Sequence, residues 1–448
     1  MSKLRDKLSY TRIIVLSFLL IILVGAVVLS LPISSRSRDW TPFFDAMFTA
    51  TSATCVTGMT IYDTYTHWSL FGQFIILLLI QIGGLGVMTC IAMIALFLKR
   101  RISLGERRLL MQSAGSLEIG GIVKLIRRII IGTTVIELFG AVLLSFIFCP
   151  KMGFLVGIWN GLFHSISAFC NAGFDLMGRY GSFSSLSAQW LATNPLFSFT
   201  ISLLIIIGGI GFIVWNDIWK HRLEFKKYEV HSKIVLSSTA ILIFSGTILF
   251  YIFESGSAFA GMHTGEKLIS SLFLSIMPRT AGFNTINLSE MSDSGTLLTA
   301  LLMFIGGGSG STAGGIKVTT FVVLLLGALA STRRRSGITI FKRRLDEHTS
   351  SQASAVVTVY FTVVFLASMI ISFIEPYPLH DILFESVAAI STAGLSKGIT
   401  PFLSSFSQAV LMFLMFSGRI GGLSLMLVLA ERRISIPIDR PTVKILIG

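Results

Sequence analysis

The chain has 448 residues, of which 53% are hydrophobic and only 13% are charged, and its formal net charge is +14. Soluble domains carry about 25% charged residues, so this composition excludes an ordinary soluble domain and predicts a protein that crosses the membrane several times. The positive charge does not indicate nucleic-acid binding, because lysine and arginine cluster in alternate connections between apolar segments, as expected of cytoplasmic loops. We therefore predict a multi-pass membrane protein with both termini in the cytoplasm.

Between these basic connections, the chain repeats one order of segments four times: an apolar span, a short amphiphilic helix, a glycine motif and a second span. We expect the first spans near residues 11–31, 128–149, 230–253 and 353–373. The short helices are expected near residues 41–54, 157–169, 266–277 and 381–390, and the second spans near residues 70–98, 195–215, 296–330 and 407–430. The short helices cannot cross a bilayer, which takes about 20 residues, so we expect them to be re-entrant.

The predicted fold is therefore an all-α membrane protein of four parallel repeats, with eight transmembrane helices and four re-entrant pore helices around a pseudo-fourfold pore. The repeats are assigned to residues 1–98, 99–219, 220–333 and 334–448. Their pore loops are expected near residues 41–59, 157–174, 266–283 and 381–395.

The glycine motif ends each short helix and recurs at intervals of 115, 109 and 112 residues, measured between Gly58, Gly173, Gly282 and Gly394. Non-helical backbone at membrane depth is tolerated only where it is buried in protein or lines water, so the four loops should face a common aqueous path. Backbone carbonyls in such loops can replace the hydration shell of a cation, and the negative C-terminal ends of the short helices favour a cation. The predicted ion-binding residues are Val56, Thr57, Gly58, Asn171, Ala172, Gly173, Thr280, Ala281, Gly282, Thr392, Ala393 and Gly394.

A second glycine-rich stretch interrupts the expected second span of the third repeat. Six of the ten residues 306–315 are glycine, and each costs a helix about 1 kcal/mol relative to alanine, so we expect a mobile loop below the filter that acts as a gate. Close helix packing through small residues is the alternative. The predicted gate comprises Gly306, Gly307, Gly308, Ser309, Gly310, Ser311, Thr312, Ala313, Gly314, Gly315, Lys317 and Arg419.

Two ionisable residues lie within apolar segments, where a charge is costly unless it is paired or lies by water. We expect Arg419 to bind carbonyls of the loop, with those of residues 306–310 as the best candidates, and to repel a passing cation. Glu137 is expected to have a partner within the bundle. The clusters at residues 83–86 and 208–211 predict tight packing around the cavity.

These motifs together resemble the membrane subunit of the bacterial Ktr potassium uptake systems (KtrB or KtrD type), in the Trk/Ktr/HKT superfamily. The resemblance covers essentially the whole chain and rests on the sequences TCVTG (54–58), SAFCNAGF (167–174), PRTAGFN (278–284), STAGL (391–395), GGGSGSTAGGIK (306–317) and GRIG (418–421). In that family the four glycines line the selectivity filter, and the presence of Gly58, rather than the serine of some plant relatives, implies potassium as the transported ion.

The resemblance further implies that the pore chain forms a homodimer in the bacterial cell (inner) membrane. Its partner would be an octameric cytosolic ring of the KtrA or KtrC type, which binds the regulatory nucleotide; no nucleotide or nucleic acid is expected on this chain itself. Sodium-dependent transport is known in the family. The protein is not expected to be an enzyme.

Two other functions were weighed against a potassium pore. A secondary transporter of another cation or small solute usually shows inverted repeats and intramembrane acids, whereas this sequence has parallel repeats and few such acids. An intramembrane serine protease using Ser309 or Ser311 needs a histidine at the same depth, and only His164 is a candidate.

Overall fold

The computed structural model describes residues 10–86, 89–90, 92–93, 121–181, 185–192, 194–222, 224–334 and 337–421, and these are mostly helical. Several sequence predictions concern residues outside this set. They are the end of the second span predicted at 70–98, most of the basic segment 99–128, the end of the span predicted at 407–430, and the basic residues near both termini.

The described residues repeat one order of elements four times: a long helix, a short helix, a glycine loop and a second helix. The long helices are α2 (Tyr10–Ser30), α8 (Ile122–Met152), α13 (Val230–Glu254) and α17 (Glu347–Ile374). The short helices are α3 (Phe43–Cys55), α9 (Phe154–Phe169), α14 (Thr264–Ile276) and α18 (Leu379–Ile390). The second helices are α5 (Leu70–Leu85), α11 (Pro195–Gly209), α15 (Asp293–Phe304) and α19 (Ser405–Ile420).

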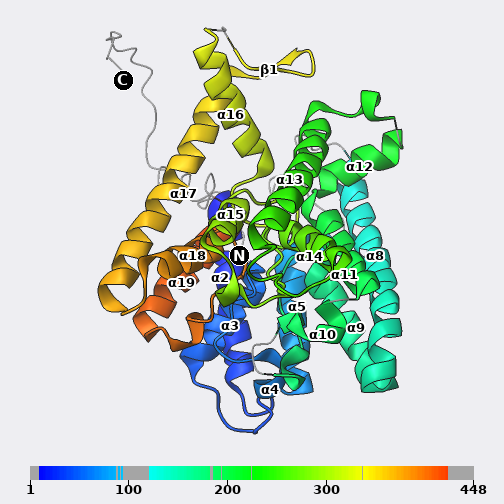
Figure 1. The fold of residues 1–448 in the computed structure, drawn as a ribbon, viewed down its shortest axis with the longest axis vertical. Coiled ribbons are helices and arrows are strands. Elements are labelled where there is room, and N and C mark those ends of the chain that lie inside the picture. The colour runs from blue at the N-terminus through cyan, green and yellow to red at the C-terminus, as the bar shows by residue number, and fades with distance from the viewer. Residues whose placement is uncertain are drawn as a thin grey trace, which may run out of the picture.

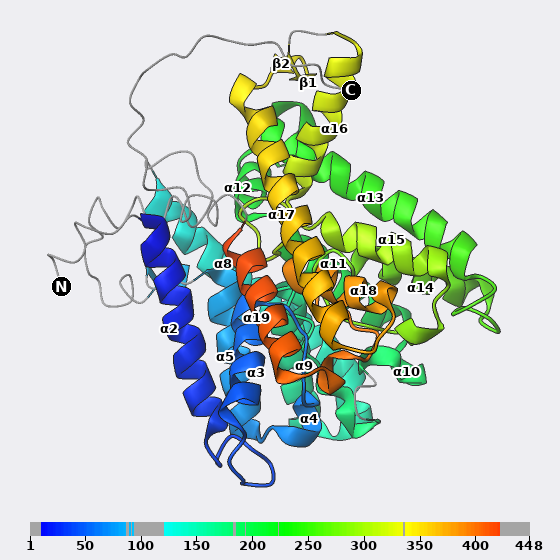
Figure 2. The ribbon, with the colours of Figure 1, turned by 90° about the vertical axis from the view of Figure 1, so that its left-hand side faces the viewer.

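The four units close into a ring. Each long helix packs on the short helix that follows it, as α2 does on α3 and α8 does on α9. Each second helix also contacts the short helix of the next unit: α5 contacts α9, α11 contacts α14, and α15 contacts α18. The ring is completed by α19, which contacts α3, so residues from the two ends of the chain lie side by side (Figure 2). The short helices therefore surround a common centre.

Four of the described helices are long and apolar enough to cross a membrane: α2, α8, α13 and α17. A fifth span is obtained if α11 and α12 (Phe212–His221), which meet at an angle of 95°, count as one. The helices α5, α15, α16 (Val318–Thr332) and α19 are apolar but shorter, at 12 to 16 residues. The helical membrane fold is confirmed, whereas the total of eight spans stays a prediction.

The second helices end earlier than the spans that the sequence predicts. In three units the helix ends at or just before a glycine in nearly the same backbone conformation: Gly86, Gly211 and Gly421 have φ of 85°, 100° and 89° and ψ of 137°, 143° and 141°. Glycine alone adopts this region at little cost. In the third unit, residues 305–317 leave the helix altogether and separate α15 from α16.

A hairpin of β1 (Thr339–Ile340) and β2 (Arg343–Arg344) lies at the same end as α12, and α4 (Thr64–His67) and α10 (Gln189–Ala192) lie at the opposite end (Figure 1). Two basic connections predicted to be cytoplasmic, at 220–233 and 333–344, thus meet at one end of the molecule.

The minor helical turns are η1 (Met177–Arg179), η2 (Ser185–Ser187), η3 (Phe225–Lys227), η4 (Leu288–Glu290) and η5 (Thr400–Phe402).

Candidate ion-conducting site

Each of the four glycine loops adopts the same unusual backbone conformation. The residue two places before each glycine has a positive φ, although none of the four is glycine: Val56 (58°), Asn171 (58°), Thr280 (67°) and Thr392 (51°). The glycines themselves have φ of 94°, 71°, 74° and 74°. Non-glycine residues in this region cost about 1–3 kcal/mol each and persist only where the surroundings impose them. The repeated strain shows that the four loops are built to one design.

The structure brings the four predicted loops together in a ring. A β-carbon placed on Gly58 would lie 2.5 Å from the carbonyl oxygen of Ala172, and one on Gly173 would lie 2.8 Å from that of Ala281. Gly282 stands in the same relation to Ala393, at 2.8 Å, and Gly394 faces the carbonyl oxygen of Thr57. The contacts therefore run from the first loop to the fourth and back to the first.

Polar atoms without partners accumulate at this ring. The hydroxyl oxygens of Thr57, Thr280 and Thr392 are buried, and none has a hydrogen-bond partner within the described part of the chain. Buried polar atoms are nearly always paired, so three unpaired oxygens within one or two residues of these glycines need an explanation. Beside the ring, a cavity of about 190 Å³ is lined by Gly58, Gly282 and Gly394, among others. Oxygen atoms next to a shared opening are what a dehydrated monovalent cation requires.

Glycines of the second helices lie in close contact with the ends of the short helices. The sequence analysis predicted only tight packing around the cavity for these glycine clusters. A β-carbon on Gly83 would collide with the carbonyl of Thr54, one on Gly208 with that of Phe169, and one on Gly418 with that of Ile390. The glycines thus allow the backbone of each second helix to support a filter loop from behind.

The glycine-rich segment 305–317 lies directly against the filter loops and the end of α11. The amide of Gly308 donates to the carbonyl of Gly209 (2.8 Å), and the amide of Phe212 donates to the carbonyl of Gly310 (2.8 Å). The Thr312 hydroxyl lies within hydrogen-bond distance of Phe169 O (3.2 Å) and of Asn171 Oδ1 (3.1 Å). The segment is a loop that touches the predicted filter residue Asn171, not a stretch of closely packed helix.

Two cations of the predicted gate hold this loop. Arg419 donates to the carbonyls of Thr312 and Gly83, and to that of Gly84 at 3.2 Å. Lys317 Nζ donates to the carbonyl of Ala313 at 2.6 Å. The expected acceptors of Arg419, residues 306–310, are therefore wrong. The guanidinium reaches the far side of the loop and the end of α5, so it links the first, third and fourth units.

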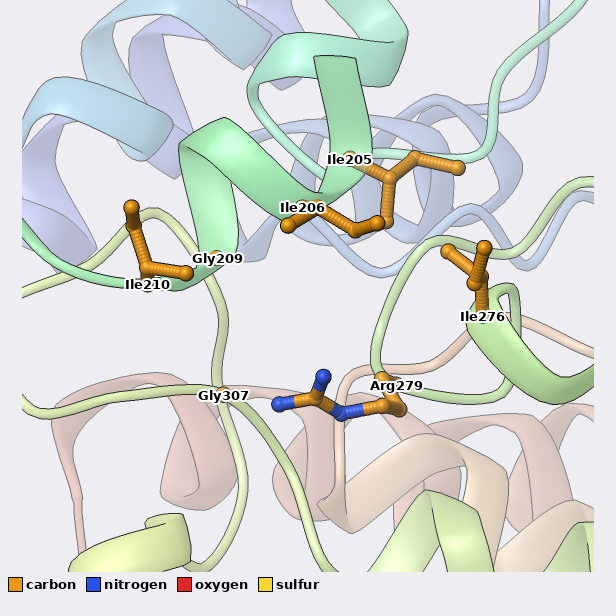
Figure 3. A pocket seen from close by; sticks show the side chains of 7 residues that line it. All are labelled: Ile205, Ile206, Gly209, Ile210, Ile276, Arg279 and Gly307. Carbon is orange, nitrogen blue, oxygen red and sulfur yellow. The ribbon is translucent and has the colours of Figure 1, made fainter. Parts of the chain in front are cut away.

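Arg279 is a buried cation beside the glycine-rich loop that the sequence analysis did not identify. It occupies the position that Cys55, Cys170 and Ser391 hold in the other loops. Its side chain is 6% exposed and points toward Gly307 of the glycine-rich loop (Figure 3). Its Nη2 donates to Thr239 Oγ1 at 3.2 Å, while Nε has no hydrogen-bond partner among the residues described. A cavity of about 10 Å³ beside it holds at most one water molecule. An arginine where the other three loops have cysteine or serine is the feature of the sequence that could have drawn attention to this residue.

Glu137 has the partner that the sequence predicts. Its carboxylate accepts from Gln81 Nε2 at 3.0 and 3.1 Å, and the thiol of Cys170 lies 3.9 Å from Oε1. Gln81 is on α5 and Cys170 follows α9, so this buried cluster joins the first and second units just behind the second filter loop.

Glu385 braces the outer side of the fourth filter loop, and sequence reasoning did not identify it. The buried carboxylate accepts hydrogen bonds from Ser396 Oγ (2.6 Å), Thr400 Oγ1 (2.7 Å) and the amide of Lys397 (3.0 Å). These donors follow Gly394 directly, so the short helix α18 holds the loop at both ends.

Replacing Glu385 by alanine should destabilise the protein. The change leaves three donors without their acceptor, and we expect the free energy of unfolding to fall by about 3 kcal/mol. Thermal unfolding of the detergent-purified variant measures the effect. The matched control is Glu290→Ala, which removes an exposed carboxylate from the segment that follows the third glycine loop. Equal unfolding temperatures for the two variants would contradict the role of Glu385.

The arrangement offers no support for the serine protease alternative. Ser309 Oγ bonds with Thr319 Oγ1, and Ser311 Oγ donates to the carbonyl of Gly308. The ring nitrogens of His164 contact the carbonyl of Asn160 and the amide of Leu176. In the described structure the two serines and the histidine thus bond with other groups.

A ring of four glycine loops, whose carbonyls face the neighbouring glycines, with a fifth loop against them, is the arrangement expected of a helical membrane protein that passes cations. The family model of TrkH, described as a cation transport protein, matches residues 21–439, so the chain belongs to the TrkH family of cation transport proteins. This membership confirms the resemblance to the Trk/Ktr superfamily.

Individual relatives agree with this assignment along nearly the whole chain. The chain is 40% identical over 94% of its length to the potassium/sodium uptake protein NtpJ of Enterococcus hirae, of which it covers 92%. It is 38% identical over 92% of its length to the Ktr system potassium uptake protein B of Bacillus subtilis, of which it covers 91%. Its fold matches the crystal structure of the potassium transporter TrkH from Vibrio parahaemolyticus with a TM-score of 0.74, at 16% identity, over 95% of this chain and 86% of that one.

Proposed function

We propose that the chain is the membrane subunit of a potassium uptake system, organised as four repeats over residues 1–98, 99–219, 220–333 and 334–448. The observation that carries this proposal is the closed ring in which the carbonyls of Thr57, Ala172, Ala281 and Ala393 each face the glycine of a neighbouring loop. These four carbonyls supply uncharged oxygen ligands for a dehydrated monovalent cation. The names of the relatives, as potassium uptake proteins, support potassium as that cation.

Ion passage is controlled by the loop at residues 306–315 together with Lys317 and Arg419. The loop lies against the filter residue Asn171 and is held there by hydrogen bonds from both cations. The positive charge of Arg419 next to the path repels a passing cation, so the arrangement described here corresponds to a closed state. Opening requires these hydrogen bonds to break. A regulatory partner outside the membrane could control this step.

A regulatory partner and a second copy of the chain complete the system. The Bacillus subtilis relatives are named as proteins B and D of a Ktr system, which supports a multi-component assembly. We propose a homodimer on an octameric cytosolic ring that binds the nucleotide. The basic connections at residues 220–233 and 333–344, which lie at one end of the molecule, are suitable contacts for such a ring and support a cytoplasmic position for that end in a bacterial cell.

Replacing Gly58 by serine tests the filter. A side chain at this position, with φ of 94°, meets the carbonyl of Ala172, so the ring must widen and lose its fit to dehydrated potassium. We expect the permeation of sodium relative to potassium to rise roughly 10-fold, equivalent to about 1.4 kcal/mol. Uptake of sodium, potassium and rubidium into proteoliposomes measures the ratio.

The matched control is Gly261→Ser. Gly261 has a similar φ of 85°, but a β-carbon there meets no atom within 4 Å among the residues described. It therefore reproduces the backbone strain without touching the ring. An unchanged ion ratio in Gly58→Ser, or an equal change in both variants, would remove Gly58 from the filter. A lack of any cation uptake by the wild-type chain would favour a transporter of another solute.

A further inference from the structure

A large apolar groove lies on the side of the molecule between α8 and the bend that joins α11 to α12. Its volume is about 610 Å³, within the range of roughly 300–1,000 Å³ typical of small-molecule sites. The lining includes Val135 of α8 and Trp215 and Trp219 of α12, and it is almost entirely hydrocarbon. Val135 is 60% exposed and Trp219 is 78% exposed, so the groove opens to the outside of the protein. Because α8 is long and apolar enough to span the membrane, that outside is the lipid.

One end of the groove carries a cation. Arg128 belongs to its lining, and Arg128 Nη1 donates to Asn216 Oδ1 at 2.9 Å. A guanidinium has five N–H donors, so this bond leaves most of them available. Lys124 and Arg127 are exposed on the same first turns of α8. Basic pockets between membrane helices on the cytoplasmic side bind anionic lipid headgroups. The groove thus combines an apolar slot facing the bilayer with positive charge at one end.

The groove also touches the proposed gate. Ile210 and Phe212 line it, and they flank Gly211, where the second helix of this unit breaks. The amide of Phe212 donates to the carbonyl of Gly310, and Gly209 accepts from the amide of Gly308. A molecule that fills the groove therefore presses on residues that are hydrogen-bonded directly to the glycine-rich loop.

We propose that this groove binds an anionic glycerophospholipid, with an acyl chain against Val135 and Trp215 and the phosphate on Arg128, and that the bound lipid biases the glycine-rich loop. Charge complementarity at Arg128 favours an anionic lipid over a zwitterionic one, and the narrow hydrocarbon slot favours an acyl chain over a folded protein surface. The lipid-binding part depends only on the membrane placement of α8, whereas the effect on the loop rests on the function proposed above.

Photolabelling of the full-length protein tests the site. Protein in nanodiscs receives phosphatidylglycerol or phosphatidylcholine that carries a photoactivatable group on one acyl chain, and mass spectrometry locates the labelled peptides. We expect residues 125–136 and 207–219 to be labelled by phosphatidylglycerol, and Arg128→Gln to reduce this labelling roughly fivefold, as expected for loss of one cation near the headgroups. The matched control is Lys151→Gln, which removes an exposed cation from the other end of α8 and should leave the labelling unchanged.

A second variant blocks the slot without changing charge. A β-carbon on Gly132 would lie 3.2 Å from the indole of Trp215, so Gly132→Trp fills the groove and should abolish labelling by both lipids. Equal labelling by the two lipids, no effect of Arg128→Gln, or labelling confined to other helices would overturn the site. So would crosslinks showing that residues 94–120 or a second copy of the chain cover these peptides.

Rubidium uptake tests the coupling separately. We expect the ratio of uptake in phosphatidylglycerol vesicles to uptake in phosphatidylcholine vesicles to differ between wild-type protein and Arg128→Gln, and to be the same in wild-type protein and Lys151→Gln. Labelling without this difference would overturn the coupling alone. Labelling without any cation uptake would leave the lipid site standing and overturn the function proposed for the chain.

Discussion

Replacing Gly394 by alanine should nearly abolish potassium flux. At φ of 74° a β-carbon is strained by about 1–2 kcal/mol, and it would collide with the carbonyl of Thr57, which forces the first and fourth loops apart. Strain and steric overlap together cost about 3 kcal/mol, so occupancy of the site should fall on the order of 100-fold. Rubidium uptake by proteoliposomes measures the loss.

Gly398→Ala is the control for this experiment. Gly398 lies four residues further along the same loop with φ of 90°, and a β-carbon there meets no described atom within 4 Å. Flux through this variant should stay within a few-fold of wild type. Normal flux through Gly394→Ala would show that the ring of glycines is not on the conduction path.

Replacing Arg419 by glutamine should raise flux in the absence of any cytosolic partner. The substitution removes the cation that bonds to Thr312, Gly83 and Gly84, and hydrogen bonds to charged groups contribute about 1.5–3 kcal/mol each. A net loss of about 3 kcal/mol from the closed state shifts the balance between closed and open forms roughly 100-fold. Basal rubidium uptake should therefore rise at least about 10-fold. The rise can be smaller than the shift between the two forms, because conduction through the open pore then limits the rate of uptake.

Two further variants test whether the effect is specific to the loop. Lys317→Gln should act in the same direction with a smaller effect, because the partners of Lys317 among the described residues, Ala313 and Gly314, both lie within the loop. Arg179→Gln removes an exposed arginine distant in sequence from the loop and should leave basal flux unchanged. A basal flux that does not change in either Arg419→Gln or Lys317→Gln would leave no gate in this loop.

The long and short helices could be predicted closely from hydropathy. The first short helix was expected at residues 41–54 and forms at Phe43–Cys55, and the fourth was expected at 381–390 and forms at Leu379–Ile390. The breaks in the second helices could not be predicted in this way, because Gly86, Gly211 and Gly421 follow apolar segments that resemble uninterrupted spans. In the structure the preceding glycines lie against the ends of the short helices, and hydropathy does not reveal these contacts.

Some features of the candidate site could likewise be predicted from the sequence, and others could not. The four glycines that meet in the ring could be predicted because their motif recurs at matched spacing, which is visible in a single sequence. The acceptors of Arg419 could not be found, because the bond to Gly83 joins residues 336 positions apart and depends on how α19 lies against its neighbours. Arg279 and Glu385 were overlooked because their roles depend on which atoms surround them, and only the structure shows those atoms.

The most direct test of the proposed pathway is a crystal of this protein grown in potassium and soaked in thallium or rubidium, with diffraction recorded at an absorption edge of that ion. An anomalous peak should lie inside the ring, at similar distances from the carbonyl oxygens of Thr57, Ala172, Ala281 and Ala393. An ion bound elsewhere in the molecule, with none inside the ring, would contradict the proposal that these four loops select the transported cation.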